Sequence, residues 1–455
     1  MEKGKEIKPI LPKVLGEYAL SNSARFQSPG HKGTGLGGFF REELSGWDII
    51  RESVVDGKDD LLAASEETFN RYYHAAHTYF ITGGVSSAIR CIFRSLSVRE
   101  SVLLPSHCNR HALYAAAEKG LNLYFMNESE EGHYESADKM ESDLVRTGAT
   151  AVFISSPDVL GYCSDLKTIS EVAHRHNALL LVDASYGAHF PFSDRFPDDA
   201  GQYADMWCCG QYYSMNALVQ GGTLHLNHCR ICPETVSEAI EIMEAENPST
   251  LIDASIDWAL HIARNADYEL LYRHCKALAD KIDSIEGLSV EGKNDPGKDF
   301  SRIAINVSGS GYSGYDIYGL LRGHGIYPSY CDKTYVVLSC NLEDKPEWYI
   351  RTEEVLSGIQ KQKISIFDNV YRFAPPNDRD IRAAFLAERT WIPFGETKGM
   401  VLGCPVGLRP SQNIMLYPGT VLDSSAISWI RDCLNEGAPL FGVSGDYCIG
   451  VVYDN

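Results

Sequence analysis

The chain contains 455 residues, 44% of them hydrophobic, which is enough for several layers of buried structure and for two or three domains. Its 61 acidic residues outnumber its 41 lysines and arginines and give a formal net charge of -20, so nucleic acids and anionic membrane surfaces are unfavourable partners. No apolar run is long enough to span a bilayer, and residues 1–13 lack the apolar core of a secretory signal, so we expect a cytoplasmic protein.

The predicted elements begin with a segment of loops and helices, residues 1–75, that we expect to wrap around the main domain. From residue 76 to 286, short apolar runs alternate with amphipathic stretches, a pattern typical of βα units on a mostly parallel sheet. The spacing of Leu166, Ile169 and Val172 predicts a helix between two of these runs. We therefore interpret residues 76–286 as a large α/β domain. Its candidate strands are residues 101–104, 121–126, 151–154, 178–182, 204–208 and 223–226.

Two smaller units are predicted after a long helical section at residues 233–285. Residues 287–372 have the pattern of a smaller α+β domain. Its predicted elements are a strand at 303–307, a helix at 315–322 and a strand at 335–339. Pro375 and Pro376 then interrupt the pattern, and residues 373–455 carry a helix and several strands separated by glycine and proline. We interpret this last part as a C-terminal subdomain.

A glycine-rich loop, residues 82–88 (TGGVSSA), separates an apolar run from a helix. Backbone N–H groups and hydroxyls of Gly84, Val85, Ser86 and Ser87 would point at whatever lies on the helix N-terminus, and an anion such as phosphate suits that position. A plain helix-capping role for Ser86 explains the same residues equally well.

Asp183 ends the buried apolar run LLLV and begins the stretch DASYGAHF, which includes Tyr186 and His189. Ligands of open α/β sheets gather beyond the carboxyl ends of the strands, where a carboxylate can pair with a cationic ring nitrogen. A capping aspartate is the alternative interpretation. Asp183 is therefore a candidate ligand-binding residue.

Cys229 and Cys232 form a CxxC motif beside His228, which is a pattern found in zinc sites. No second CxxC or HxxxH follows at finger-like spacing, so we predict no metal site. Without a secretory signal, the 13 cysteines are interpreted as reduced thiols and not as a disulfide framework.

Five motifs follow one another in a distinctive order. They are SPGHKG at residues 28–33, the glycine-rich loop, VLL at 102–104 with Cys108, SP…GY at 156–162 and VD…GAHF at 182–190. Together they resemble the short bacterial ornithine/lysine/arginine decarboxylases, and further similar segments at 211–220, 314–317 and 416–419 extend the resemblance over nearly the whole chain. The resemblance implies an aspartate-aminotransferase-like fold (fold type I of the pyridoxal-phosphate enzymes), with sites at the interface of a dimer. A homodimer is the expected assembly.

The resemblance also assigns cofactor contacts, and several of them are missing here. Asp183 matches the family's aspartate beneath the pyridine nitrogen, and residues 84–87 approximate its phosphate loop. Where the family has the histidine that stacks on the cofactor ring, this chain has Asn109. Where the family has Ser-x-His-Lys, whose lysine forms the Schiff base, residues 210–213 read GQYY, so Tyr213 stands at the lysine position.

No shift of this alignment restores an amine, because no lysine occurs between Lys167 and Lys276. Pyridoxal phosphate is the cofactor that the resemblance implies, but a tyrosine phenol forms no imine with it. We therefore expect a non-catalytic homologue with a regulatory or structural role, either a homodimer or a heterodimer with an active paralogue.

Two alternatives remain open. In a repurposed enzyme, the cofactor would bind non-covalently, and Tyr212, Tyr213 or His189 would move protons. The residues expected around such a cofactor are Gly84, Val85, Ser86, Ser87, Asn109, Asp183, Tyr186 and Gly210. In a still active decarboxylase, whose substrate would be an amino acid, Lys32 or another lysine from the partner chain would replace the missing amine. Tyr212 and Tyr213 can also simply fill the space of an absent cofactor.

Overall fold

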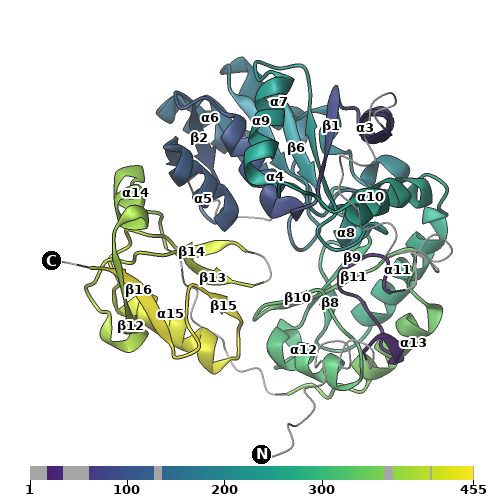
Figure 1. Cartoon of the computed structure of the whole chain (residues 1–455). Coiled ribbons are helices and arrows are strands. Elements are labelled where there is room, and N and C mark those ends of the chain that lie inside the picture. Colours follow the sequence, from purple (N-terminus) through teal and green to yellow (C-terminus); the bar gives the residue numbers. More distant parts are fainter. Residues whose placement is uncertain are drawn as a thin grey trace, which may run out of the picture.

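The computed structural model describes residues 18–33, 61–127, 136–362, 371, 373–409 and 412–453. Within the predicted N-terminal segment 1–75, residues 1–17 and 34–60 lie outside this range. The described chain forms a large sheet covered by helices, a smaller sheet beneath it and a C-terminal part built on two further sheets (Figure 1).

The large sheet has seven strands in the order β1-β7-β6-β5-β4-β2-β3. They are β1 (His77–Ile81), β2 (Ser101–Leu104), β3 (Asn122–Phe125), β4 (Ala151–Ser155), β5 (Leu179–Asp183), β6 (Met206–Cys209) and β7 (Gly222–Leu226). Neighbouring strands from β3 to β6 pair in parallel, whereas β7 is antiparallel to both β6 and β1. The predicted α/β class with a mostly parallel sheet is confirmed. All six predicted strands are present, and β1 is an additional strand in the apolar run before the glycine-rich loop.

The strands of this sheet are apolar on both faces because helices cover both. In β5, Leu179 and Leu181 belong to one buried cluster, and Leu180 and Val182 to the other. One face is covered by α4 (Gly84–Ser95), α5 (Arg110–Lys119) and α9 (Pro233–Met243), and the other by α3 (Leu61–Tyr72), α6 (Ala137–Thr147), α7 (Leu166–Arg175) and α10 (Thr250–Ala263). The layered packing holds the carboxyl ends of the parallel strands at one edge.

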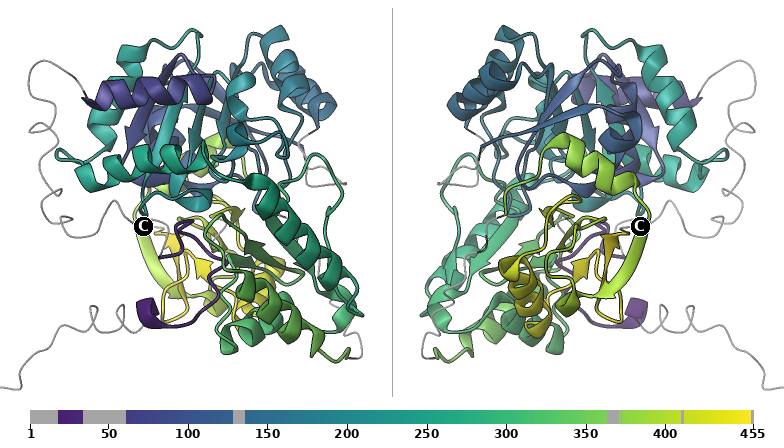
Figure 2. Two further views of the ribbon diagram at one scale, coloured as in Figure 1. Left: turned by 90° about the vertical axis from the view of Figure 1, so that its right-hand side faces the viewer. Right: turned by 90° about the vertical axis from the view of Figure 1, so that its left-hand side faces the viewer.

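The smaller sheet is antiparallel, with the strand order β10-β11-β9-β8. Its elements are β8 (Ser289–Val290), β9 (Arg302–Asn306), α12 (Gly314–Gly323), β10 (Tyr330–Cys331), β11 (Tyr335–Ser339) and α13 (Pro346–Ser357), and α11 (Tyr268–Asp283) leads into it. The two predicted strands and the helix between them are present. Residues 18–33 lie against this sheet (Figure 2). Ala24 forms a parallel β-bridge with Ile326, and the ring centroids of Phe26 and Trp348 are 6.2 Å apart.

The described residues of the C-terminal part contain two α-helices, where the sequence predicted one helix. Its elements are α14 (Asp378–Leu386), β12 (Arg389–Pro393), β13 (Val406–Leu408), β14 (Ile414–Leu416), α15 (Ser424–Asn435), β15 (Leu440–Phe441) and β16 (Cys448–Val452). It docks on the start of α5, where Arg110 N–H donates to the Gln412 carbonyl at 3.0 Å and Ile414 N–H to the Cys108 carbonyl at 3.1 Å. These contacts bring the segment before β14 to the edge of the large sheet.

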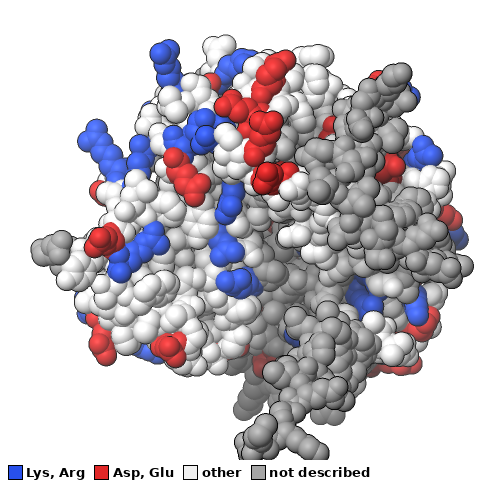
Figure 3. Space-filling view, viewed as in Figure 1, with Lys and Arg blue, Asp and Glu red and all other residues white. Residues whose placement is uncertain are grey.

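The surface carries both signs of charge. On the face shown in Figure 3, lysines and arginines lie among aspartates and glutamates and form no single continuous patch. Among the described helices, none combines the length and the apolar character that a membrane crossing requires.

Candidate functional site

Asp183 lies at the carboxyl end of β5, and its side chain is buried. One carboxylate oxygen accepts hydrogen bonds from the backbone N–H of Ser185 at 3.1 Å and from the Ser185 hydroxyl, and the other accepts from Asn109 Nδ2 at 3.5 Å. Burial raises the pKa of Asp183, although these donors act in the opposite direction. The carboxylate is thus held by neutral donors and has retained the capacity to accept from a ligand.

A cavity of about 140 Å³ lies beyond Asp183. It brings together six residues that the sequence predicted to surround a cofactor or to move protons: Val85, Ser86, Asn109, Asp183, Tyr186 and Tyr213. It also includes residues that sequence reasoning missed: His111, Ser155, Pro157, Asp158, Val159, Ser185, Gln412 and Asn413. The cavity volume is below the roughly 300 Å³ at the lower end of small-molecule pockets.

Two tyrosines lie where the sequence resemblance predicts the position of a Schiff-base lysine. The ring centroids of Tyr212 and Tyr213 are 4.2 Å apart, and Tyr213 also packs on Tyr186 at 4.8 Å. A Cβ at Gly210 would collide with the Tyr213 ring and with the Ser185 carbonyl, so glycine is required there. Burial raises the pKa of Tyr213 well above 10 and that of Tyr212 to about 12. Both phenols therefore remain neutral near neutral pH.

The glycine-rich loop is bound by a carboxylate of this same chain. Glu244, which ends α9, accepts hydrogen bonds from the backbone N–H of Thr82 at 2.7 Å and of Gly83 at 2.9 Å. It also accepts from the hydroxyls of Thr82, at 3.0 Å, and Ser87. Gly83 is the N-cap of α4 and no side chain caps it, so the capping role considered for Ser86 is not observed. Glu244 thus already satisfies donors of Thr82 and Gly83 at the start of the glycine-rich loop and the Ser87 hydroxyl of the predicted phosphate loop.

Five of the predicted residues do not line the cavity, and four of them lie next to residues that do. Ser87 bonds Glu244, and Gly84 lies against Gln220 with a backbone φ of +75°, a conformation that favours glycine. The backbone of Gly210 and the ring of Tyr212 both lie against the Tyr213 ring. All four are adjacent to cavity residues and position them.

His189 is separated from the cavity, although the sequence grouped it with Tyr212 and Tyr213. Its Nε2 lies 3.2 Å from the Asp299 carboxylate, and its ring packs on Phe196 at 4.3 Å. Both His189 and Asp299 are buried. His189 therefore connects the loop after β5 to the segment that precedes β9.

Lys32, the lysine considered as a replacement amine, is also engaged elsewhere. Its Nζ donates to the carbonyl of Gln27 at 2.9 Å and to that of Ser339 at 3.0 Å, and it lies 4.0 Å from Asp344. The side chain is buried in its own chain. Within the described residues, no cluster of histidine, cysteine or acidic side chains could hold a metal ion, and Cys229 and Cys232 are free thiols.

These residues do not fit covalently bound pyridoxal phosphate. Neither lysine nor arginine is among the described residues that line the cavity, and it contains the carboxylates of Asp158 and Asp183. His111 supplies no positive charge, because burial lowers its pKa to about 4. The cavity therefore offers no amine for an imine and little charge for a phosphate group.

The chain has relatives that match almost its whole length. The family model described as "Orn/Lys/Arg decarboxylase, major domain" matches residues 9–289, more than half of the chain. An arginine decarboxylase of Halalkalibacterium halodurans is 24% identical, and the match covers 96% of each chain. An arginine decarboxylase of Bacillus subtilis is also 24% identical, with 94% of each chain covered.

Solved structures show the same fold. The constitutive lysine decarboxylase of E. coli superposes with a TM-score of 0.71 at 13% identity, over 98% of this chain and 82% of that one. A ureidoglycine–glyoxylate aminotransferase from Bacillus subtilis gives a TM-score of 0.56 at 15% identity, over 71% of this chain and 90% of that one. The predicted aspartate-aminotransferase-like fold is thereby confirmed.

Proposed function

Because this chain belongs to the Orn/Lys/Arg decarboxylase family, we propose that it is a member that does not form the internal aldimine and serves as a non-catalytic regulatory or structural subunit. The observation that carries this proposal is the Tyr213 side chain, which lies in the cavity beside Asp183 and packs on Tyr186. The family's cofactor chemistry starts from a primary amine at this position, and a phenol cannot supply it.

Two further observations support a closed site. The rings of Tyr186, Tyr212 and Tyr213 pack on one another, which leaves a cavity of about 140 Å³. Glu244 occupies donors of the glycine-rich loop that would otherwise be free for an anion. The proposed assembly is a homodimer, or a heterodimer in which this chain supports an active paralogue.

A repurposed enzyme with non-covalent cofactor is the second candidate, and the position of Asp183 favours it. The carboxylate faces the cavity and can accept from a protonated ring nitrogen. The proton carriers that this candidate needs are poorly supplied, because burial keeps the phenols of Tyr212 and Tyr213 neutral and His189 is paired with Asp299. An amino acid remains the expected small-molecule ligand of such an enzyme.

The first prediction concerns decarboxylation. The purified full-length chain, given excess pyridoxal phosphate and arginine, lysine or ornithine, is expected to release carbon dioxide at the rate of a protein-free blank. A bacterial arginine decarboxylase serves as the positive control. Turnover of any of the three amino acids above the blank would refute the non-catalytic proposal, and the purified chain must be shown to be folded by circular dichroism.

A further inference from the structure

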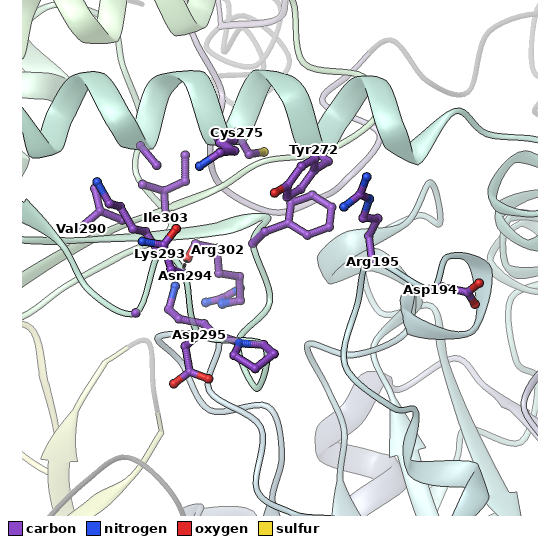
Figure 4. Close-up of a pocket in the computed structure, with 16 residues that line it drawn as sticks. Asp194, Arg195, Tyr272, Cys275, Val290, Lys293, Asn294, Asp295, Arg302 and Ile303 are labelled. Atoms are coloured by element: carbon purple, nitrogen blue, oxygen red, sulfur yellow. Dashed lines mark hydrogen bonds between the residues drawn. The ribbon is translucent and has the colours of Figure 1, made fainter.

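A second cavity of about 350 Å³ lies between α11, the loop at residues 291–301 and residues 194–195 (Figure 4). Its volume is within the range of about 300–1,000 Å³ that is usual for small-molecule sites. It has no lining residue in common with the cavity beside Asp183. It is therefore a separate candidate site.

Positive charge is concentrated around this second cavity, although the whole chain carries a formal net charge of -20. The cationic side chains that line it are Arg195, Lys276, Lys293, Lys298 and Arg302. Two carboxylates, Asp194 and Asp295, also line it, and Asp194 points away from the other side chains in Figure 4. Arg195, Lys276 and Lys293 each pair with a carboxylate outside the lining, so the positive charge available to an anion is that of Lys298 and Arg302.

Lys298 differs from the other lysines and from Arg195 in lacking a carboxylate partner. Arg195 pairs with Glu269 at 2.8 Å and Lys293 with Asp283 at 2.5 Å. Lys298 is only 6% exposed, and its Nζ donates to the Arg302 carbonyl at 2.7 Å. Among the described residues, this ammonium group forms no ion pair within 4.0 Å, and the carboxylates of Asp299, Asp158 and Glu291 act on it only from farther away. An ammonium group has three donors, and a buried one is stabilised by an anionic partner.

The backbone holds Lys298 firmly at this position. Gly292 has a φ of +59°, and a Cβ there would lie 2.6 Å from the Tyr162 hydroxyl and 2.7 Å from Lys298 Cδ. The absent side chain leaves room for the lysine stem between Gly292 and Tyr162. The ring of Tyr272 packs on Phe300 at 5.1 Å and gives the cavity an apolar wall. The cavity thus offers one fixed cation beside an apolar surface.

From this geometry we propose that the second cavity binds a small ligand through an oxyanion, a carboxylate or a phosphate, that pairs with Lys298. The ligand's remaining atoms lie against Tyr272 and Phe300. Arg302 connects this site to the first one, because it lines the second cavity and its guanidinium lies 4.2 Å from the ring centroid of Tyr186. The proposal does not depend on whether the first cavity is catalytic.

The test is calorimetric titration of the full-length chain with inorganic phosphate and, separately, with malonate, so that the two oxyanions are distinguished. Lys298→Met is expected to weaken binding by roughly tenfold or more, because it removes the buried charge partner. Lys281→Met, an exposed lysine on α11 that pairs with Glu353, is the matched control and should bind like the unmodified chain. The proposal would be overturned if neither phosphate nor malonate binds, or if Lys298→Met binds them with the same affinity as the unmodified chain.

The affinity of the unmodified chain for malonate, measured over a series of pH values, gives a second test that does not require a substitution. Burial, and to a smaller extent the nearby Arg302 guanidinium, lower the pKa of Lys298 to about 8, although the carboxylates of Asp299, Asp158 and Glu291 act in the opposite direction. Because the anion pairs with the charged form, affinity for malonate should fall by roughly tenfold between about pH 7 and pH 9. Lys298→Arg, which stays charged, should bind without this dependence. A flat profile in the unmodified chain would count against Lys298 as the partner.

Discussion

Asp299→Ala is expected to lower the free energy of unfolding by about 1–3 kcal/mol, because it removes a buried acceptor that lies 3.2 Å from His189 Nε2. The change also removes the acceptor of the Ser301 hydroxyl, which donates to Asp299 at 2.7 Å. The measurement is urea unfolding followed by circular dichroism. Arg195→Ala is the control, since it removes an exposed ion pair with Glu269 that is worth at most about 1 kcal/mol. Equal destabilisation by the two variants would contradict this role of Asp299.

The buried Asp299 carboxylate also makes the stability of the chain depend on pH. Burial alone would raise the pKa of Asp299, but His189 and the Ser301 donors together hold it below its usual value. A depressed carboxyl pKa stabilises the folded state above the unfolded value of about 3.9, and this contribution is lost as pH falls through the folded value. The difference in stability between the unmodified chain and Asp299→Ala should therefore be complete at neutral pH and shrink in acid.

Combining Tyr213→Lys with Glu244→Ala is expected to change cofactor retention from none to one covalent equivalent per chain. The first change places a primary amine in the cavity beside Asp183, which is the group that an imine with the cofactor requires. The second change releases the N–H groups of Thr82 and Gly83 for a phosphate group. The readout is intact mass after pyridoxal phosphate and borohydride.

The matched control for the double variant carries its new lysine on the surface, at Val219, which is 55% exposed. Val219→Lys with Glu244→Ala should show only the background labelling of exposed lysines. Equal labelling in both double variants would mean that position 213 has no special access to the cofactor, and the account of the cavity would then be wrong.

The sequence predicted the main sheet well because its strands are buried on both faces and are bounded by turn residues. The run LLLV before Asp183 is one example, and the order of the motifs predicts that Tyr213 stands at the family's lysine position. The direction of β7 and the pairing of β1 at the edge were not predictable from local patterns, because they depend on which strands meet in space.

The candidate site was predicted less completely. His189 is only three residues from Tyr186, but the 3-10 turn at Phe190–Phe192 follows it and its ring lies in the aromatic cluster with Phe196. Gln412 and Asn413 reach the cavity from the C-terminal part, far away in sequence. Glu244 ends an ordinary amphipathic helix, so no local signal marks it as the acceptor of the glycine-rich loop.

The most direct test of the central claim is the absorption spectrum of the unmodified chain after excess pyridoxal phosphate and desalting, before and after borohydride, with intact mass and peptide mapping. No retained visible band and no stoichiometric adduct are expected, because no lysine lines the cavity among the described residues. A visible band with one adduct mapped to a single lysine would contradict this expectation, and would show that this chain binds the family's cofactor through an amine other than the one it has lost.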